Sequence, residues 1–342
     1  MNNPQSSIAA LTAICLSLLL AACLPTRFLI DLAPSDGKLH ESTVLTDTGA
    51  SRGSPKIALI DITGLISNAP EPGLFAGGGN SVDRLVSQLK KATDDPRVKA
   101  VILRVDSPGG TVAASKTMYQ EIRRFREQTS KPVVVSMSEL AASGGYYISL
   151  AADHIIAQST TITGSIGVII QTVNFSKGMQ MIGITARAVK SGPMKDIANP
   201  LEPIRDEQYA ILQSTVDDFY DSFVSLVKNR RGAALNQSEL TTLTDGRVFT
   251  GRQALKHGLV DELGSLRDAF DSAKSLADIS AARLVKYHVE GRVPMSPYAA
   301  SLPLPSPAAQ APGRQVNIMQ LNLPQGFTPS AGFYYLWSPT LP

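Results

Sequence analysis

Residues 100–136 read AVILRVDSPGGTVAASKTMYQEIRRFREQTSKPVVVS, and this stretch decides the fold. Residues 100–105 form a short apolar run that is typical of a strand buried on both faces. A tight turn follows at residues 106–110, and then a helix is predicted from Thr111 to about Arg126. A second apolar strand is predicted from Pro132 to Ser136. Strand, helix and strand at this spacing predict a βαβ unit, in which the two strands are parallel.

The same alternation continues on both sides of this unit. We expect strands at 56–62, 154–157 and 283–289, helices at 82–93 and 206–230, a short helix after residue 143, and a mostly helical stretch at 247–277. The pattern predicts an α/β fold with a largely parallel sheet. No internal repeat is visible, so we expect one catalytic unit per chain.

Composition excludes several classes of function. The chain has 342 residues and a formal net charge of +3, with no basic run interleaved with aromatic residues, so we do not expect it to bind nucleic acid. Both cysteines, Cys15 and Cys23, lie in the first 23 residues, which excludes a disulfide framework or a cysteine zinc site in the rest of the chain. The histidines stand singly, without ligand spacing, at positions 40, 154, 257 and 288. We therefore expect no metal and no other cofactor.

The first residues indicate export. Ile8–Cys23 is an apolar stretch of signal-peptide length, too short to span a bilayer comfortably. It ends in LAAC at residues 20–23, which resembles the lipobox of bacterial lipoproteins, so we expect lipid attachment at Cys23. No lysine or arginine precedes it, which leaves an ordinary or uncleaved secretory segment as the alternative. Either interpretation places the rest of the chain in the bacterial cell envelope, outside the cytoplasm, and the lipid would anchor it to a membrane.

Four regions follow from these patterns. Residues 1–23 are the predicted signal peptide, and residues 24–55, which are broken by proline and glycine, are the predicted tether. Residues 56–290 form the predicted catalytic domain. Residues 291–342 are rich in proline, serine and alanine, and we expect an extended or partly disordered tail.

Two small-residue motifs could carry chemistry. Residues 140–147 read LAASGGYY, which places Ser143 between a strand and a helix, where a cramped turn can present its hydroxyl group. Gly144 can bring its N–H close to an oxyanion. The turn at 106–110, DSPGG, ends a buried strand at the sheet edge where α/β proteins place their sites, and Gly109 and Gly110 both offer unobstructed N–H groups. Taken alone, the motif around Ser143 is more often a plain loop or helix N-cap. The turn at 106–110 could equally be a tight βα turn in which Asp106 bonds its own backbone.

A serine nucleophile needs a base, and no histidine lies in a suggestive loop. Lysine serves as a base where burial disfavours its charged form. Lys195 lies in a loop that reads SGPMKDI at residues 191–197. Composition alone favours a solvated surface lysine, and Asp196 beside it would oppose loss of the charge if its carboxylate pointed inward.

Five segments in order resemble the signal peptide peptidase A family, whose members are serine peptidases with a Ser-Lys dyad. The matching segments are residues 105–110, 142–147, 163–167, 191–196 and 245–264, and the resemblance covers roughly residues 56–280. It implies a Clp-protease/crotonase-like fold, a superhelix of ββα units with a largely parallel sheet.

The resemblance also implies roles for individual residues. Ser143 matches the nucleophile, Lys195 the base, and Ser165 a serine that orients the lysine. The oxyanion hole falls on the N–H groups of Gly110 and Gly144. The implied reaction is hydrolysis of peptide bonds in cleaved signal peptides and other apolar peptides at the bacterial membrane.

The resemblance also bears on the oligomeric state, and two alternatives to the peptidase function stay open. Members of the family form homo-oligomeric rings or domes in which neighbouring subunits contribute to one site, so we expect a homo-oligomer. One alternative is a catalytically inactive envelope scaffold on the same fold. The other is a crotonase-type acyl-CoA hydratase or isomerase, which would need carboxylates at the site and access to CoA.

Overall fold

The strands of the computed structural model lie in two sheets. They are β1 (His40–Thr46), β2 (Lys56–Thr63), β3 (Val98–Ser107), β4 (Gly109–Thr111), β5 (Val133–Ala142), β6 (His154–Ala157), β7 (Ile162–Gly164), β8 (Val248–Thr250), β9 (Glu262–Leu263), β10 (Arg283–His288) and β11 (Tyr334–Leu336). The nine-stranded sheet has the order β1-β10-β2-β3-β5-β6-β9, and β7 pairs with β5 and β8. Its pairs are parallel except β1 with β10 and β7 with β8. The second sheet joins β11 to β4 in antiparallel fashion.

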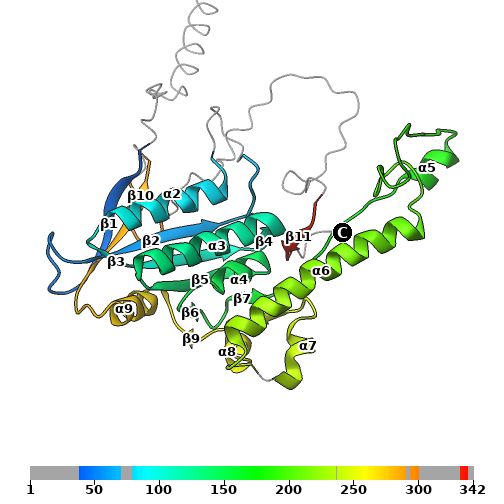
Figure 1. Cartoon of the computed structure of the whole chain (residues 1–342). Helices are drawn as coiled ribbons and strands as arrows, with labels where there is room; N and C mark the ends of the chain where they lie inside the picture. The colour runs from blue at the N-terminus through cyan, green and yellow to red at the C-terminus, as the bar shows by residue number, and fades with distance from the viewer. Residues whose placement is uncertain (1–37, 71–78, 236, 290–292, 300–331, 338–342) are drawn as a thin grey trace, which may run out of the picture. The chain divides into compact units, whose positions relative to one another are not determined.

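Helices follow most of the central strands (Figure 1). They are α2 (Ser81–Asp94), α3 (Val112–Thr129), α4 (Gly144–Ser149), α5 (Ser176–Met181), α6 (Asp206–Arg231), α7 (Leu240–Leu243), α8 (Gly251–Lys256) and α9 (Leu266–Leu276), with a 3-10 turn at Gln237–Glu239. The predicted α/β fold with a largely parallel sheet is confirmed.

The structure describes residues 38–70, 79–235, 237–289, 293–299 and 332–337. The predicted signal peptide, with Cys23, lies outside the described residues, as do most of the predicted tail and the first part of the predicted tether. Within the described ranges, no helix is both long enough and apolar enough to cross a membrane.

The central strands are apolar along their whole length because both faces are covered. Successive side chains of a strand point to opposite faces. Ile60 and Leu103 therefore pack with α2, α3 and α4, whereas Leu59 and Ile102, one residue earlier, pack with α9. Burial of each such side chain contributes about 1.5–3 kcal/mol to the stability of the fold. Because both faces are buried, these strands are apolar at every position and do not alternate between apolar and polar residues.

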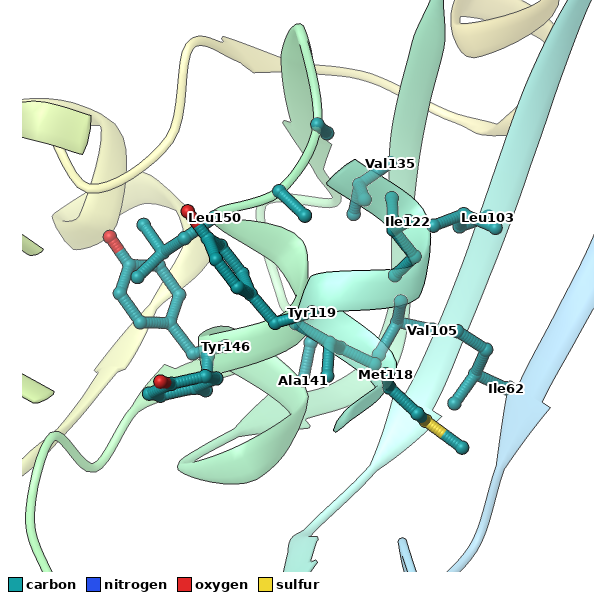
Figure 2. Close-up of a cluster of buried hydrophobic side chains, with 14 of the residues drawn as sticks. Ile62, Leu103, Val105, Met118, Tyr119, Ile122, Val135, Ala141, Tyr146 and Leu150 are labelled. Carbon is teal, nitrogen blue, oxygen red and sulfur yellow. The ribbon is translucent and has the colours of Figure 1, made fainter. Parts of the chain in front are cut away.

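Helices α3 and α4 contribute side chains to the buried cluster that Figure 2 shows against the sheet. Met118 and Ile122 of α3 and Tyr146 of α4 belong to the same buried cluster as Val105 and Val135 of the sheet. This packing fixes where α4 begins relative to the ends of β3 and β5.

A cap at Thr111 starts α3 immediately after β4. The Thr111 Oγ1 accepts a hydrogen bond from the Ala114 N–H at 3.2 Å, which satisfies one of the free donors of the first turn. At the other end, Ser130 adopts a left-handed conformation with φ 54°. The Gly109-Gly110 turn is thus held between the end of β3 and a capped helix.

Several elements differ from the sequence prediction. Residues 40–46, which we interpreted as part of a tether, form β1. They do so because β10, far away in sequence, pairs with them in antiparallel fashion, with His40 opposite His288. Residues 334–336, within the predicted tail, form β11 on β4. The stretch 247–277 contains the short strands β8 and β9 between its helices. Strand β5 continues beyond Ser136 to Ala142.

Candidate active site

Ser143 lies at the junction of β5 and α4. Its backbone has φ 52° and ψ −111°, a conformation that side-chain-bearing residues rarely adopt and that costs about 1–3 kcal/mol. Two hydrogen bonds hold it: the Ser143 N–H donates to the Gly164 oxygen, and the Tyr147 N–H donates to the Ser143 oxygen, both at 2.8 Å. The surrounding structure therefore maintains a strained turn at the predicted nucleophile.

The two predicted oxyanion donors, Gly110 and Gly144, lie against each other. A Cβ atom built on Gly144 would lie 3.0 Å from the Gly110 nitrogen and 2.5 Å from the Ser115 Oγ. A Cβ atom built on Gly109 would lie 2.7 Å from the Gly144 nitrogen, and Gly109 also has φ 104°. Only glycine permits this approach of backbone to backbone, so the glycines are required by packing as well as by chemistry.

Ser165 lies beside the same turn. It follows β7, whose last residue, Gly164, pairs with Ala142 and accepts the Ser143 N–H. Ser165 itself has φ 50°, donates its N–H to the Arg247 oxygen at 2.8 Å and is buried. Parallel pairing of β5 with β7 thus brings Ser165 to the nucleophile from a separate part of the sequence.

Lys195 is not brought to this turn within one chain. It lies in the loop between α5 and α6 and its side chain is exposed. Figure 1 places α5 at the end of α6 that points away from α4. We call residues 171–205 the arm. Its hydrogen bonds and ion pairs, such as Lys190 with Asp196 and Glu202, have partners within the arm or in the first turn of α6.

The arm exposes many apolar side chains. Met181 is 87% exposed, and the other large apolar residues exposed on it are Val173, Phe175, Ile182, Ile184, Val189, Leu201 and Ile204. Isolated exposed apolar residues are common, but so many in one short segment are typical of an interaction surface.

Burial governs the titration of two groups near the turn. Burial raises the pKa of the Asp106 carboxyl group, and the Leu140 N–H that donates to it at 3.2 Å offsets this effect only in part. Burial, with a smaller effect of Tyr119, raises the pKa of Tyr147 to about 12. Tyr147 therefore remains neutral beside the nucleophile at neutral pH.

The sequence analysis missed β11 and the aromatic residues around it. Tyr335 is 1% exposed, and its ring contacts those of Tyr147 and Phe223. The signal available in the sequence was the aromatic run FYYLW at residues 333–337, within a tail otherwise rich in proline and small residues. Ser115 was also missed, because its packing against Gly144 is visible only in three dimensions.

Comparisons with known proteins give the family of this sequence. The family model described as Peptidase family S49 matches residues 125–280. A putative signal peptide peptidase SppA of Enterococcus faecium is 36% identical over 241 residues, which cover 70% of this chain and 69% of that protein. A putative protease of Synechocystis is 36% identical over 240 residues, covering 70% of this chain and 81% of the other.

Protease 4 of Haemophilus influenzae is 39% identical over 226 residues, 65% of this chain but only 35% of that longer protein. The match to a solved structure, the 1510-N membrane-bound stomatin-specific protease, covers 65% of this chain and 86% of that chain, with a TM-score of 0.43 at 16% sequence identity. The family assignment therefore rests on the sequence relatives and not on this structure. This chain belongs to the signal peptide peptidase A family, peptidase family S49.

Proposed function

We propose that this protein is a serine peptidase with a Ser-Lys dyad, and that the dyad forms between two copies of the chain. Ser143, Ser165, Gly110 and Gly144 come from one copy, and Lys195 comes from the arm of a neighbouring copy. The observation that carries the proposal is the convergence of the first four residues on one strained turn, while Lys195 is exposed on the arm.

The proposed reaction proceeds in two halves. The neutral Lys195 amine takes the proton of the Ser143 hydroxyl as Oγ bonds to the carbonyl carbon of the peptide. The N–H groups of Gly110 and Gly144 stabilise the oxyanion, and the C–N bond then breaks with the proton passing to the leaving amine. Water attacks the resulting ester in the same manner and releases the new carboxylate. Ser165 would hold the lysine amine in the orientation that both halves need.

Assembly accounts for the composition of the arm. Exposed apolar residues such as Met181, Ile182 and Val189 would be buried against a second copy. Heterologous contacts of this kind close into a ring when the rotation permits, and each contact then completes one active site.

The substrates we propose are cleaved signal peptides and other apolar peptides at the membrane. The name of the Enterococcus relative refers to signal peptides. Lipid attachment at Cys23 would hold the chain at the membrane of the bacterial cell envelope. Mass spectrometry of the mature N-terminus tests the anchor, and an unmodified Cys23 would refute it.

A mixing experiment tests the dyad. Full-length Ser143→Ala and Lys195→Ala variants should each lose nearly all hydrolysis of an apolar peptide while keeping their circular dichroism spectra. Refolded together in equal amounts, they should recover activity at about a quarter of the sites, because a site needs serine from one variant and lysine from the other. Lys177→Ala, also on the arm, serves as the matched control and should keep full activity.

Other outcomes discriminate among the alternatives. Full activity of Lys195→Ala would remove lysine from the mechanism, and no recovery on mixing would place the dyad within one chain. A wild-type protein that neither cleaves peptides nor reacts with a serine-directed acylating probe would be an inactive scaffold. Sequence relatives named as proteases give the crotonase-type alternative no support.

A further inference from the structure

Ser115 is a fully buried serine whose hydroxyl group makes no hydrogen bond. It lies near the start of α3, and its Oγ has no donor or acceptor partner among the residues that the structure describes. A buried hydroxyl group that is left unpaired destabilises a fold, because it has lost its hydrogen bonds to water and gained none in return. Such groups are few in native proteins, so this one calls for an explanation.

The surrounding structure does not lack hydrogen-bond acceptors. Three other fully buried hydroxyl groups of this region each donate to a main-chain carbonyl at 2.6–2.7 Å, those of Ser107, Ser149 and Thr163. Ser149 gives the closest comparison, because it also lies in a helix and donates to the carbonyl four residues before it, the usual bond of a helical serine. Ser115 does not make the corresponding bond.

The unpaired hydroxyl group lies beside the two predicted oxyanion donors. The Ser115 Oγ and the Gly110 nitrogen lie 2.5 Å and 3.0 Å from one point, the position of a Cβ atom built on Gly144. The Gly144 nitrogen in turn lies 2.7 Å from the equivalent point on Gly109. Because Gly144 has no side chain, the hydroxyl group takes the space that a Cβ atom there would fill. The hydroxyl group and both N–H donors therefore share one small region.

An unpaired hydroxyl group can respond to a charge that forms nearby. Its proton turns about the bond between Cβ and Oγ, and no hydrogen bond has to break first. A dipole that is buried away from water is screened far less than one in solution, so it acts on a charge that it does not touch. Attack by Ser143 on a peptide carbonyl group creates such a charge, the oxyanion. Stabilisation of the transition state then offsets the cost of leaving the group unpaired in the resting protein.

We propose that the Ser115 hydroxyl group supports the oxyanion hole, and that its O–H dipole turns toward the oxyanion and stabilises it together with the N–H groups of Gly110 and Gly144. Because Ser115 does not touch the reacting atoms, its effect is smaller than that of a direct donor. This inference rests on the peptidase function proposed above. The competing explanation is that Ser115 only fills space next to Gly144.

Replacement by alanine should stabilise the fold and slow the reaction at the same time. In the full-length protein, Ser115→Ala should raise the melting temperature by about 2–4 °C, because the unpaired group is gone. For an apolar peptide, kcat should fall about tenfold while KM stays unchanged, because the lost interaction is made only in the transition state. Ser149→Ala, which removes a paired hydroxyl group from a buried helical position, is the matched control. It should neither raise the melting temperature nor lower kcat.

A fluorophosphonate probe measures the first step without a natural substrate. The Ser143 Oγ bonds to phosphorus, the bond from phosphorus to fluorine breaks, fluoride leaves, and the hydroxyl proton passes to the Lys195 amine. The phosphoryl oxygen takes the place of the oxyanion. Mass spectrometry of the intact protein should show that Ser115→Ala is labelled about tenfold more slowly than the wild type.

Two further variants separate the hydroxyl dipole from packing. Ser115→Cys fills the same space with a group that is only a weak donor, so it should be labelled as slowly as Ser115→Ala. Ser115→Thr keeps the hydroxyl group and should be labelled within a few-fold of the wild-type rate, although its extra methyl group should lower the melting temperature. If Ser115→Thr does not fold, the comparison of the cysteine and alanine variants still decides.

The outcomes distinguish this inference from the proposed function. Equal labelling rates for the wild type and Ser115→Ala would overturn the role of Ser115 and leave the peptidase function standing. A wild-type rate in Ser115→Cys would assign Ser115 to packing alone. A wild-type protein that the probe does not label at all would overturn the peptidase function and, with it, the role of Ser115.

Discussion

The backbone N–H of Ser143 donates a 2.8 Å hydrogen bond to the carbonyl oxygen of Gly164, the residue that precedes Ser165. This one bond joins the end of β5 to the end of β7 and holds the predicted nucleophile in its strained conformation. It also fixes Ser165 beside Ser143. The strain at Ser143 and the position of Ser165 are therefore two consequences of a single strand pairing.

Removing the strain at Ser143 should stabilise the fold. At φ 52°, glycine is accommodated without penalty but alanine is not. Ser143→Gly should therefore unfold with a free energy about 1 kcal/mol higher than Ser143→Ala in urea titrations, while both variants lack peptidase activity. A Ser143→Gly variant no more stable than Ser143→Ala would show that the turn carries no strain.

A methyl group on Gly144 should disrupt the oxyanion hole. Its Cβ would lie 2.5 Å from the Ser115 Oγ and 3.0 Å from the Gly110 nitrogen, so the backbone must move. Gly144→Ala should lower kcat about 10²–10³-fold, the usual effect of losing one oxyanion donor. Gly79→Ala, where a Cβ atom meets nothing within 4 Å, is the matched control. Adding Ser115→Ala to Gly144→Ala should recover part of the stability, because one of the close contacts is removed.

Removing one partner of the buried ion pair between Lys286 and Asp61 should destabilise the fold more than removing both partners. The Lys286 ammonium, fully buried, lies 2.6 Å from Asp61 and donates to the Ala299 carbonyl at 2.7 Å. Asp61→Asn should lower the free energy of unfolding by about 3–5 kcal/mol, because it leaves a buried charge without its counter-charge.

The double variant with Lys286→Met provides the control for that pair. It should recover much of the loss in thermal or urea unfolding, although Arg104, 2.9 Å from Asp61, keeps the recovery incomplete. A single variant as stable as the wild type would contradict the importance of this pair.

Asp106 should make stability depend on pH in an unusual direction. Burial raises the pKa of its carboxyl group in the folded state above the value of 3.8 that it has when exposed. Between these two values the folded chain binds the proton more tightly than the unfolded chain, so this group adds stability as the pH falls. The stability of the wild type minus that of Asp106→Asn should therefore increase as the pH is lowered from 7 toward 4. Urea unfolding at successive pH values measures it, and a flat or opposite trend would contradict the raised pKa.

Local sequence determined the central strands and the residues of the turn. The apolar runs at 56–62 and 100–105 are typical of strands covered on both faces, and they are β2 and β3. Ser143 followed by two glycines at the end of an apolar strand predicted a cramped turn, which β5 and α4 form. These predictions succeed because burial and backbone freedom are properties of each residue and its neighbours.

Tertiary structure alone decided which distant segments meet. Strand β1 has no strong apolar run, and the aromatic run of β11 does not show which strand it would join. Each strand forms because a paired strand elsewhere leaves its N–H and C=O groups free to bond. Local patterns did not show which strands would bring Ser165 beside Ser143; only the family resemblance assigned Ser165 to the site, and the pairing of β7 with β5 places it there. Composition alone favoured an exposed Lys195, but its position on the arm is visible only in the structure. The physical reason is that strand pairing and chain reversal depend on contacts between residues far apart in sequence, whereas the chemistry of the Ser143 turn is encoded in its few adjacent residues.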